Sequence, residues 1–207
     1  VGAVFDDNGF SNELIGDMIN SGTFNTSGTN VFLGEITSSG TIAASGSIDL
    51  SGDFTNSGTF TSTGCNINIS GDWNNTGTYT YFSGDNVTFD GAGTSTITGA
   101  TDWYELTADK IGLTVTSGAQ NIHGILDLDQ GTFTSGGLVT LISDATSTGQ
   151  MDNTDGATFS GDLTVQRRIA KTGQSWSSIT SPVEGTTLAT WQGNGVLFSG
   201  FPTSDFP

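Results

Sequence analysis

Residues 52–60 read "GDFTNSGTF", and nearly the same phrase returns along the first half of the chain. It appears as "GDMINSGTF" from Gly16, "GEITSSGTI" from Gly34 and "GDWNNTGTY" from Gly71. These phrases, with the one from Gly52, start 18, 18 and 19 residues apart. Two further glycine columns keep a similar spacing: Gly22, Gly40, Gly58, Gly77 and Gly28, Gly46, Gly64, Gly84. A fixed period of this length is typical of repeat proteins.

The spacing predicts an all-β fold, a parallel β-solenoid (β-helix) with about 18–20 residues per coil. Each coil would hold three short strands whose side chains alternate inward and outward. Glycine would supply the unusual backbone angles of the corners, including Gly58. After residue 90 the period loosens to about 20, and we expect further coils at 91–110, 111–130 and 131–150 and a last strand pair at 156–168. The total is about eight coils.

Apolar residues recur at matching positions of each repeat and predict the core. The expected columns are Met18, Ile36, Phe54, Trp73; Phe24, Ile42, Phe60, Tyr79; and Val31/Leu33, Ile48/Leu50, Ile67/Ile69, Val87/Phe89. A polar column beside a corner is expected to form hydrogen bonds along the axis: Asn20, Ser38, Asn56, Asn75. Trp73, Trp103 and Tyr104 are interpreted as core, with an exposed aromatic face that contacts glycans as the alternative.

The many short strands also suit a sandwich or barrel built from hairpins, but the identity of the columns favours the solenoid. Residues 1–165 would form the solenoid. Residues 166–207 carry all three prolines and no glycine period. We expect them to form a capping segment or the start of the next module. Because the chain opens on Val1 and both ends fall inside a pattern, it is interpreted as processed or partial.

The charge is strongly negative, with a formal net charge of −17 and only four Lys and Arg residues. A field of this sign repels phosphate backbones and anionic lipids, so we expect no nucleic-acid partner. No apolar run is long enough to cross a bilayer, so we expect no membrane insertion.

Four acidic residues recur at one corner: Asp17, Glu35, Asp53 and Asp72. Neighbouring carboxylates about 4.8 Å apart repel one another by roughly 1 kcal/mol in water. One interpretation is that solvent, counter-ions and hydrogen bonds from turn N–H groups offset this repulsion. The other is a calcium site, because Ca²⁺ prefers carboxylate and carbonyl oxygens. The glycine- and aspartate-rich nonapeptide of calcium-binding β-rolls is absent, and no other cofactor is expected.

We find no catalytic motif in the sequence and expect a non-enzymatic protein. His123 is the only histidine, Cys65 the only cysteine, and no nucleophile-elbow motif accompanies them. A glycan-cleaving β-helix would need a carboxylate pair across a cleft. Ice binding would need complete Thr-x-Thr ladders, which "TFT" at 59–61 and "TYT" at 78–80 fit and "TFN" at 23–25 and "TIA" at 41–43 break.

The repeats resemble the "GxFxNxGTFxxxG" arrays of large secreted surface proteins from Bacteroidota. The tail at 165–207, "VQRRI…GQSWSSITSPVEGTTLATWQ…SGFPTSDFP", is similar to the segment that often follows such arrays. This resemblance implies an extracellular or bacterial cell-surface protein, exported by the type IX secretion machinery, with a role in cell adhesion or gliding motility. The C-terminal sorting domain of such proteins is not in this sequence.

Together these features predict a stiff repeat stalk of an adhesin or gliding-type protein. Its extracellular partners, surfaces or glycan ligands, would be bound by regions outside this chain. The alternative is a β-helix protein that itself binds or cleaves glycans. A stalk needs no groove, whereas a glycan site needs a groove with acidic and aromatic walls.

Overall fold

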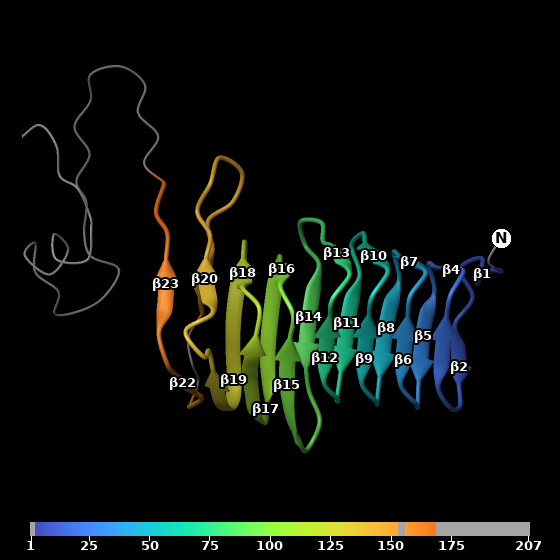
Figure 1. The fold of residues 1–207 in the computed structure, drawn as a ribbon, viewed down its shortest axis with the longest axis horizontal. Coiled ribbons are helices and arrows are strands. Elements are labelled where there is room, and N and C mark those ends of the chain that lie inside the picture. Colours follow the sequence, from blue (N-terminus) through green and yellow to red (C-terminus); the bar gives the residue numbers. More distant parts are fainter. Residues whose placement is uncertain (1–2, 153–155, 169–207) are drawn as a thin grey trace, which may run out of the picture. The chain divides into compact units, whose positions relative to one another are not determined.

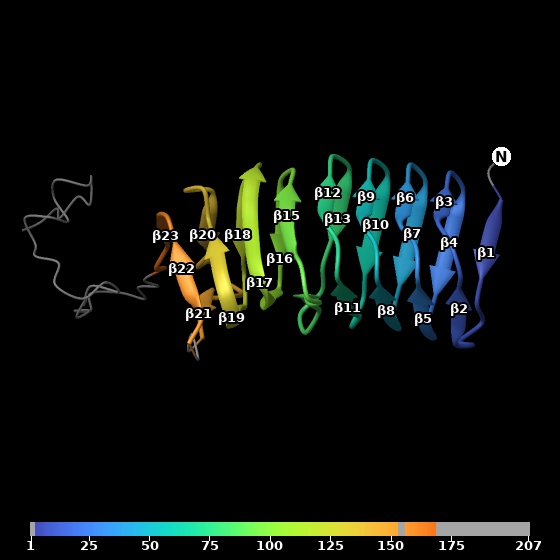
Figure 2. The same ribbon diagram turned by 90° about the horizontal axis from the view of Figure 1, so that it is seen from below.

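The protein is described here from a computed structural model, which describes residues 3–152 and 156–168. This part of the chain contains β-strands and no helix, and its strands stack in parallel as a β-solenoid of about seven turns. The predicted fold class is therefore confirmed, with about one coil fewer than expected. Figures 1 and 2 show the coils following one another along a single axis, and strands pair in parallel with strands one coil away.

Three strands form each early coil, and each contributes to one of three faces. The first face is a five-stranded sheet of β1 (Val4–Asp6), β4 (Thr23–Thr26), β7 (Thr41–Ala44), β10 (Thr59–Ser62) and β13 (Thr78–Thr80). A separate four-stranded sheet holds the corresponding strands of the later coils, β16 (Thr101–Trp103), β18 (Gln120–Ile122), β20 (Val139–Leu141) and β23 (Leu163–Val165).

The second and third faces belong to one 14-stranded sheet. The second face holds β2 (Asn12–Leu14), β5 (Thr29–Phe32), β8 (Ser47–Leu50), β11 (Asn66–Ile69), β14 (Asn86–Phe89) and β21 (Gln150–Met151). The third holds β3 (Met18–Asn20), β6 (Ile36–Ser38), β9 (Phe54–Asn56), β12 (Trp73–Asn75), β15 (Thr94–Thr98) and β22 (Thr158–Ser160). Two long strands, β17 (Glu105–Ser117) and β19 (Ile125–Thr134), run through both faces and join them.

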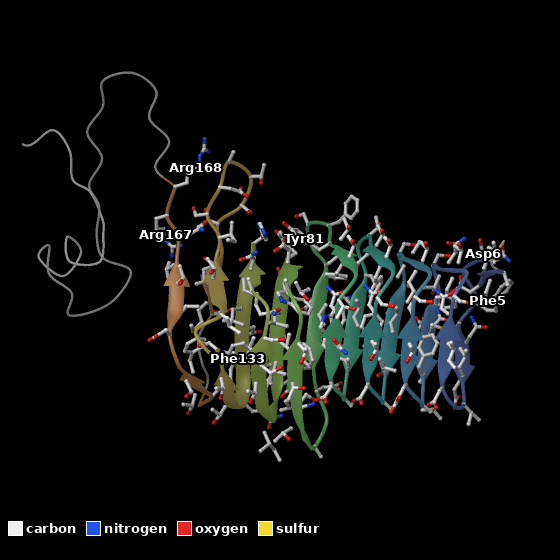
Figure 3. All side chains as sticks on the ribbon, viewed as in Figure 1. Phe5, Asp6, Tyr81, Phe133, Arg167 and Arg168 are labelled. Atoms are coloured by element: carbon white, nitrogen blue, oxygen red, sulfur yellow. The ribbon has the colours of Figure 1, made fainter. Side chains whose placement is uncertain are left out.

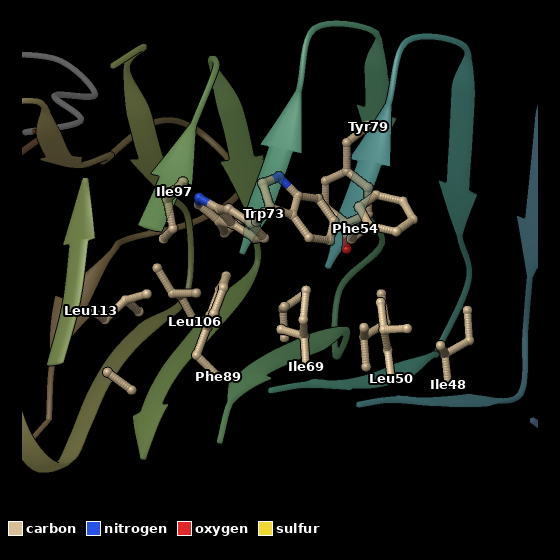
Figure 4. Close-up of a cluster of buried hydrophobic side chains, with 14 of the residues drawn as sticks. Ile48, Leu50, Phe54, Ile69, Trp73, Tyr79, Phe89, Ile97, Leu106 and Leu113 are labelled. Carbon is tan, nitrogen blue, oxygen red and sulfur yellow. The ribbon is translucent and has the colours of Figure 1, made fainter. Parts of the chain in front are cut away.

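The predicted apolar columns line the interior on all three faces, apart from the first repeat of the third column. Strand pairing aligns Phe24 with Ile42 and Phe60, and Ile36 with Phe54 and Trp73. Met18 is half-buried because it lies near the open end of the stack, whereas the other members are buried. Figure 4 shows the resulting core, in which Phe54 and Trp73 approach to a ring-centre distance of 4.5 Å.

The third predicted column is wrong in its first repeat. Asn30 and Phe32, rather than Val31 and Leu33, pair with Ile48 and Leu50 and point inward. Leu33 is instead 47% exposed. A polar Asn30 occupies a core position because its side chain donates to the buried Asp7 carboxylate at 2.9 Å.

Asp7 lies in the corner after β1 and connects it to the corresponding corner of the next coil, after β4. Its carboxylate accepts hydrogen bonds from the backbone N–H groups of Gly9 and Ser27 and from the Thr26 hydroxyl at 2.6 Å. Burial raises the pKa of this carboxyl, but the hydrogen bonds outweigh burial and hold the pKa well below its usual range.

The predicted polar column is confirmed as a buried amide ladder beside one corner. Asn20 donates to the Ser38 hydroxyl at 3.1 Å, and Asn56 donates to the Asn75 carbonyl oxygen at 2.9 Å. Asn56 also accepts from the N–H of Gly58, which ties the ladder to the turn. The ladder satisfies polar groups that the corner would otherwise leave unpaired inside the molecule.

The corner glycines are required for two different reasons. Gly64 and Gly84 have a positive φ, as predicted. Gly40, Gly58 and Gly77 do not have a positive φ. Each lies directly against the preceding coil: a Cβ built on Gly58 would be 2.0 Å from the carbonyl oxygen of Gly40. Close backbone stacking, rather than an unusual backbone angle, therefore selects glycine in this column.

The predicted capping segment or next module at 166–207 lies, after Arg168, outside the described residues. No helix long and apolar enough to span a membrane is found in the described part of the chain.

Candidate functional site

The predicted acidic column lies along the outside of one corner, and the backbone of the next coil binds its carboxylates. Asp17 accepts from the N–H of Glu35 at 2.9 Å, and Asp53 accepts from the N–H of Asp72 at 2.8 Å. Asp72 accepts from the N–H of Thr96 at 2.7 Å. These bonds match the interpretation in which turn N–H groups offset the repulsion between the acids.

Calcium binding at Asp17, Glu35, Asp53 and Asp72 stays a prediction. Within residues 3–152 and 156–168, no three His, Cys, Asp or Glu side chains come together as a group that could hold a metal ion. The carboxylates are one coil apart along the axis, so they follow a line rather than surround a point. The arrangement itself gives calcium no cage of carboxylate oxygens.

The Thr ladder that ice binding would need is only half present on the first face. One outward column is complete, because strand pairing aligns Thr23, Thr41, Thr59 and Thr78. The parallel column begins with Asn25 and Ala43 before Thr61 and Thr80. The missing threonines leave no regular two-column array on these coils.

A second candidate site is a groove of about 420 Å³ that we call the corner groove. It lies where the first face turns into the second, after β13, β16, β18 and β20. Its lining is mainly polar and aromatic: Tyr81, Ser83, Tyr104, Glu105, His123, Gly124, Ile125, Thr146, Ser147, Thr148 and Gln150. Figure 3 shows Tyr81 at the edge of the stack from which the loop after β20 also projects.

The repeat brings the aromatic rings of the groove together. Tyr104 directly follows β16 and His123 directly follows β18, and these strands pair with Trp103 opposite Ile122. Tyr81 follows β13 and reaches along the axis, so its ring centre lies 6.3 Å from Tyr104 and 5.1 Å from His123. Tyr81 and Tyr104 are half-buried, so parts of both side chains remain accessible to a ligand.

A short loop after β20 forms the opposite wall of the groove. Asp144 accepts hydrogen bonds from the backbone N–H groups of Thr146 and Ser147, and these bonds lower its pKa to about 2. The Ser147 hydroxyl lies 3.3 Å from Nδ1 of His123, and Asp144 Oδ2 lies 3.8 Å from the same atom. The loop is therefore fastened both to itself and to the preceding coil.

Three carboxylates lie in or near the corner groove, and two of them affect the hydroxyl of Tyr81. Burial raises the pKa of Tyr81, and the negative charges of Asp102 and Asp144 raise it further. Asp102 is held in place by the side chain of Asn121, which donates to it at 2.7 Å. Glu105 lines the groove itself. The site therefore combines aromatic rings, hydroxyl groups and negative charge.

The structure separates the three aromatic residues that the sequence grouped together. Trp73 and Trp103 are 1% and 0% exposed and belong to the core, as predicted. Tyr104 departs from the core interpretation, because it lines the corner groove. The three residues thus form no exposed aromatic face.

A scan of the chain against protein-family models finds no match, and searches of curated proteins and of solved structures find none either.

The corner groove was missed at the sequence level, although its residues leave a trace there. The repeat lengthens between Tyr79 and Gly84, where the glycine columns need a small insertion. Tyr81 lies in that insertion. The loop that carries Asp144 is a second departure from the period. Insertions at the same corner of nearby coils are thus the signal that could have indicated a site.

Proposed function

We propose that this chain is the non-enzymatic, stiff stalk of an extracellular surface protein. The observation that carries the proposal is the parallel stacking of the coils. Successive strands of the second and third faces pair with their counterparts one coil away, and those of the first face do so except between β13 and β16. A stack of this kind resists bending, because bending would break backbone hydrogen bonds on one face and compress the apolar columns on another. The acidic surface keeps such a stalk soluble.

Stretching single molecules between their ends tests the mechanical part of this proposal. We expect a long linear rise in force followed by unfolding in small steps of about one coil each, because each coil contacts mainly its neighbours. Extension at low force without such steps would contradict a stalk function.

The repeat and tail resemblances support the cellular part of the proposal. We propose a bacterial cell-surface adhesin or gliding-type protein of the Bacteroidota, exported by the type IX secretion machinery. The test is surface labelling of the full-length protein on intact source cells and on cells with a disabled type IX system. Equal labelling in both would overturn the proposed export route.

The corner groove favours a second function, glycan binding by the solenoid itself. Tyrosine rings that remain partly accessible, beside hydroxyl, amide and carboxylate groups, can stack on a sugar ring and bind its hydroxyl groups. Titration calorimetry with neutral oligosaccharides, using the chain and its Tyr81→Leu variant, tests this function. Glycan binding is supported if an oligosaccharide releases or absorbs heat on binding to the chain but not on addition to the variant. It is contradicted if no oligosaccharide binds to the chain.

A further inference from the structure

The corner groove has features that a stalk does not require. A mechanical solenoid needs paired strands and a packed interior, and most residues that line this groove belong to neither, apart from Glu105, Ile125 and Gln150 at strand ends. A volume of about 420 Å³ lies in the range of small-molecule binding sites. The loop that forms its wall adds a feature that the repeats lack.

The local charge restricts the ligands that fit. Three carboxylates lie in or beside the groove: Glu105 in its lining, and Asp102 and Asp144 close enough to Tyr81 to affect its hydroxyl. Two described arginines lie near this loop: Arg167 donates to the carbonyl oxygen of Gly149 at 3.2 Å, and the backbone N–H of Arg168 donates to the Ser143 hydroxyl at 3.0 Å. Neither arginine lines the groove, whereas Glu105 does, so the groove favours a cation over an anion.

The aromatic rings select for the same charge. The face of a tyrosine ring carries negative electrostatic potential and attracts ammonium groups, most strongly where water is partly excluded. Tyr81 and Tyr104 are half-buried, so their rings combine partial desolvation with access. A neutral sugar would use the rings but leave the carboxylates without a charged partner.

We propose that the corner groove binds saccharides that carry ammonium groups, with the amine beside Glu105 and the sugar ring against Tyr81 and Tyr104. This inference rests on the second proposed function, glycan binding, and deepens it. The ligand class is an amino sugar whose nitrogen is unacetylated. An acidic saccharide, with its carboxylates or sulfates, is the class that this groove excludes.

The test compares two oligosaccharides with the same sugar backbone, one with charged amines and one with acetylated, neutral nitrogens. The probes are a β-1,4-linked tetramer of glucosamine and the corresponding tetramer of N-acetylglucosamine, titrated into the whole chain at a mildly acidic pH that protonates the amines. We expect the aminated tetramer to bind at least about tenfold more tightly than the acetylated one, with an advantage that falls as salt is added.

Two variants separate the charge from the rings. Glu105→Gln keeps the shape of the side chain and should weaken binding of the aminated tetramer about fivefold to tenfold, with little effect on the acetylated one. Tyr81→Leu should weaken the binding of both the aminated and the acetylated tetramer. The control is Glu13→Gln, which removes an exposed acid on β2, far from the groove in the stack, and should change neither affinity. Circular dichroism shows whether each variant keeps its fold.

The outcomes are distinct. Tighter binding of the aminated tetramer that Glu105→Gln abolishes supports the inference. Equal binding of both tetramers overturns it but leaves glycan binding intact. Binding of neither tetramer overturns the inference, and the titrations with other neutral oligosaccharides then decide whether the groove binds glycans at all. An equal loss of affinity for the aminated tetramer in Glu105→Gln and Glu13→Gln would indicate that the acidic surface as a whole attracts this ligand. That result would overturn the assignment to this groove.

Discussion

Gly58 shows how a single residue enforces the stacking of coils. The carbonyl oxygen of Gly40 occupies the space that a side chain at position 58 would need, and the same contact recurs between Gly58 and Gly77. Glycine is therefore required in this column because the backbones of successive coils lie too close for a Cβ atom. Gly93 is a useful contrast, since its φ is not positive and a Cβ there would meet nothing within 4 Å.

Replacing Gly58 with alanine should lower the free energy of unfolding by about 2–3 kcal/mol, because two coils must move apart. Gly93→Ala should change it by less than about 0.5 kcal/mol. Urea denaturation of both variants checks the prediction. Equal stability of the two would show that the coils tolerate a Cβ at this corner.

Asp7 makes the stability of the first coils depend on pH. Its folded pKa is depressed below the usual 3.8, so its contribution is complete above about pH 4 and is lost as the pH falls toward the folded value. We expect the free energy of unfolding of the wild type to exceed that of Asp7→Asn by roughly 2 kcal/mol at neutral pH. This difference should become smaller as the pH falls. Denaturation at a series of pH values measures the gap. A gap that widens as the pH falls would contradict the assignment.

At the scale of the strand, inward positions carry two kinds of column with different functions. Apolar columns supply buried area, whereas the amide ladder satisfies backbone and side-chain groups beside the corner. Asn56 satisfies both side-chain and backbone groups. It donates to the side chain of Asn75 and to the carbonyl oxygen of Thr78, and it accepts from the N–H of Gly58. A single ladder residue thus connects two coils and a turn.

Asn56→Ala should cost about 2–3 kcal/mol, because it leaves buried partners unsatisfied. The matched control is Asn74→Ala, on the adjacent strand β12, whose carbonyl oxygen Oδ1 already has no hydrogen-bond partner. It should cost less than about 1 kcal/mol. Thermal unfolding of both variants decides the matter, and an equal loss would indicate that the ladder contributes nothing of its own.

At the scale of the whole molecule, the sequence has a net charge of −17 and only four Lys and Arg residues. Lys110 is one of them, and it is buried, where its ammonium group donates to Ser70 and Ser95. Burial lowers the pKa of Lys110, although Asp90 and Asp72 oppose this effect. Most of the acidic charge therefore faces solvent without a neutralising base.

Raising the salt concentration should raise the melting temperature, since salt screens the repulsion between like charges. Calcium and magnesium at equal ionic strength should act alike if backbone N–H groups already bind the acidic column. Scanning calorimetry of wild type, Asp53→Asn and the exposed control Asp49→Asn tests this. An increase specific to calcium that only Asp53→Asn removes would establish the predicted calcium site instead.

The sequence alone determined the period, the fold class and most of the core. Columns such as Phe24, Ile42 and Phe60 could be predicted because a parallel solenoid places equivalent residues of successive repeats directly above one another. The amide ladder followed from the same rule. This success depends on regularity, since a constant period converts a position in sequence into a position in space.

Only the tertiary structure decided what happens where the period breaks. It placed Asn30 rather than Val31 inside, because Asp7 from the preceding coil provides a partner that no local pattern announces. It showed that Gly58 is required by contact between coils. It also brought Tyr81 beside His123, two coils away, to form the corner groove. Side chains and loops that leave the repeat are placed by contacts between coils, and such contacts depend on three-dimensional packing rather than on spacing along the chain.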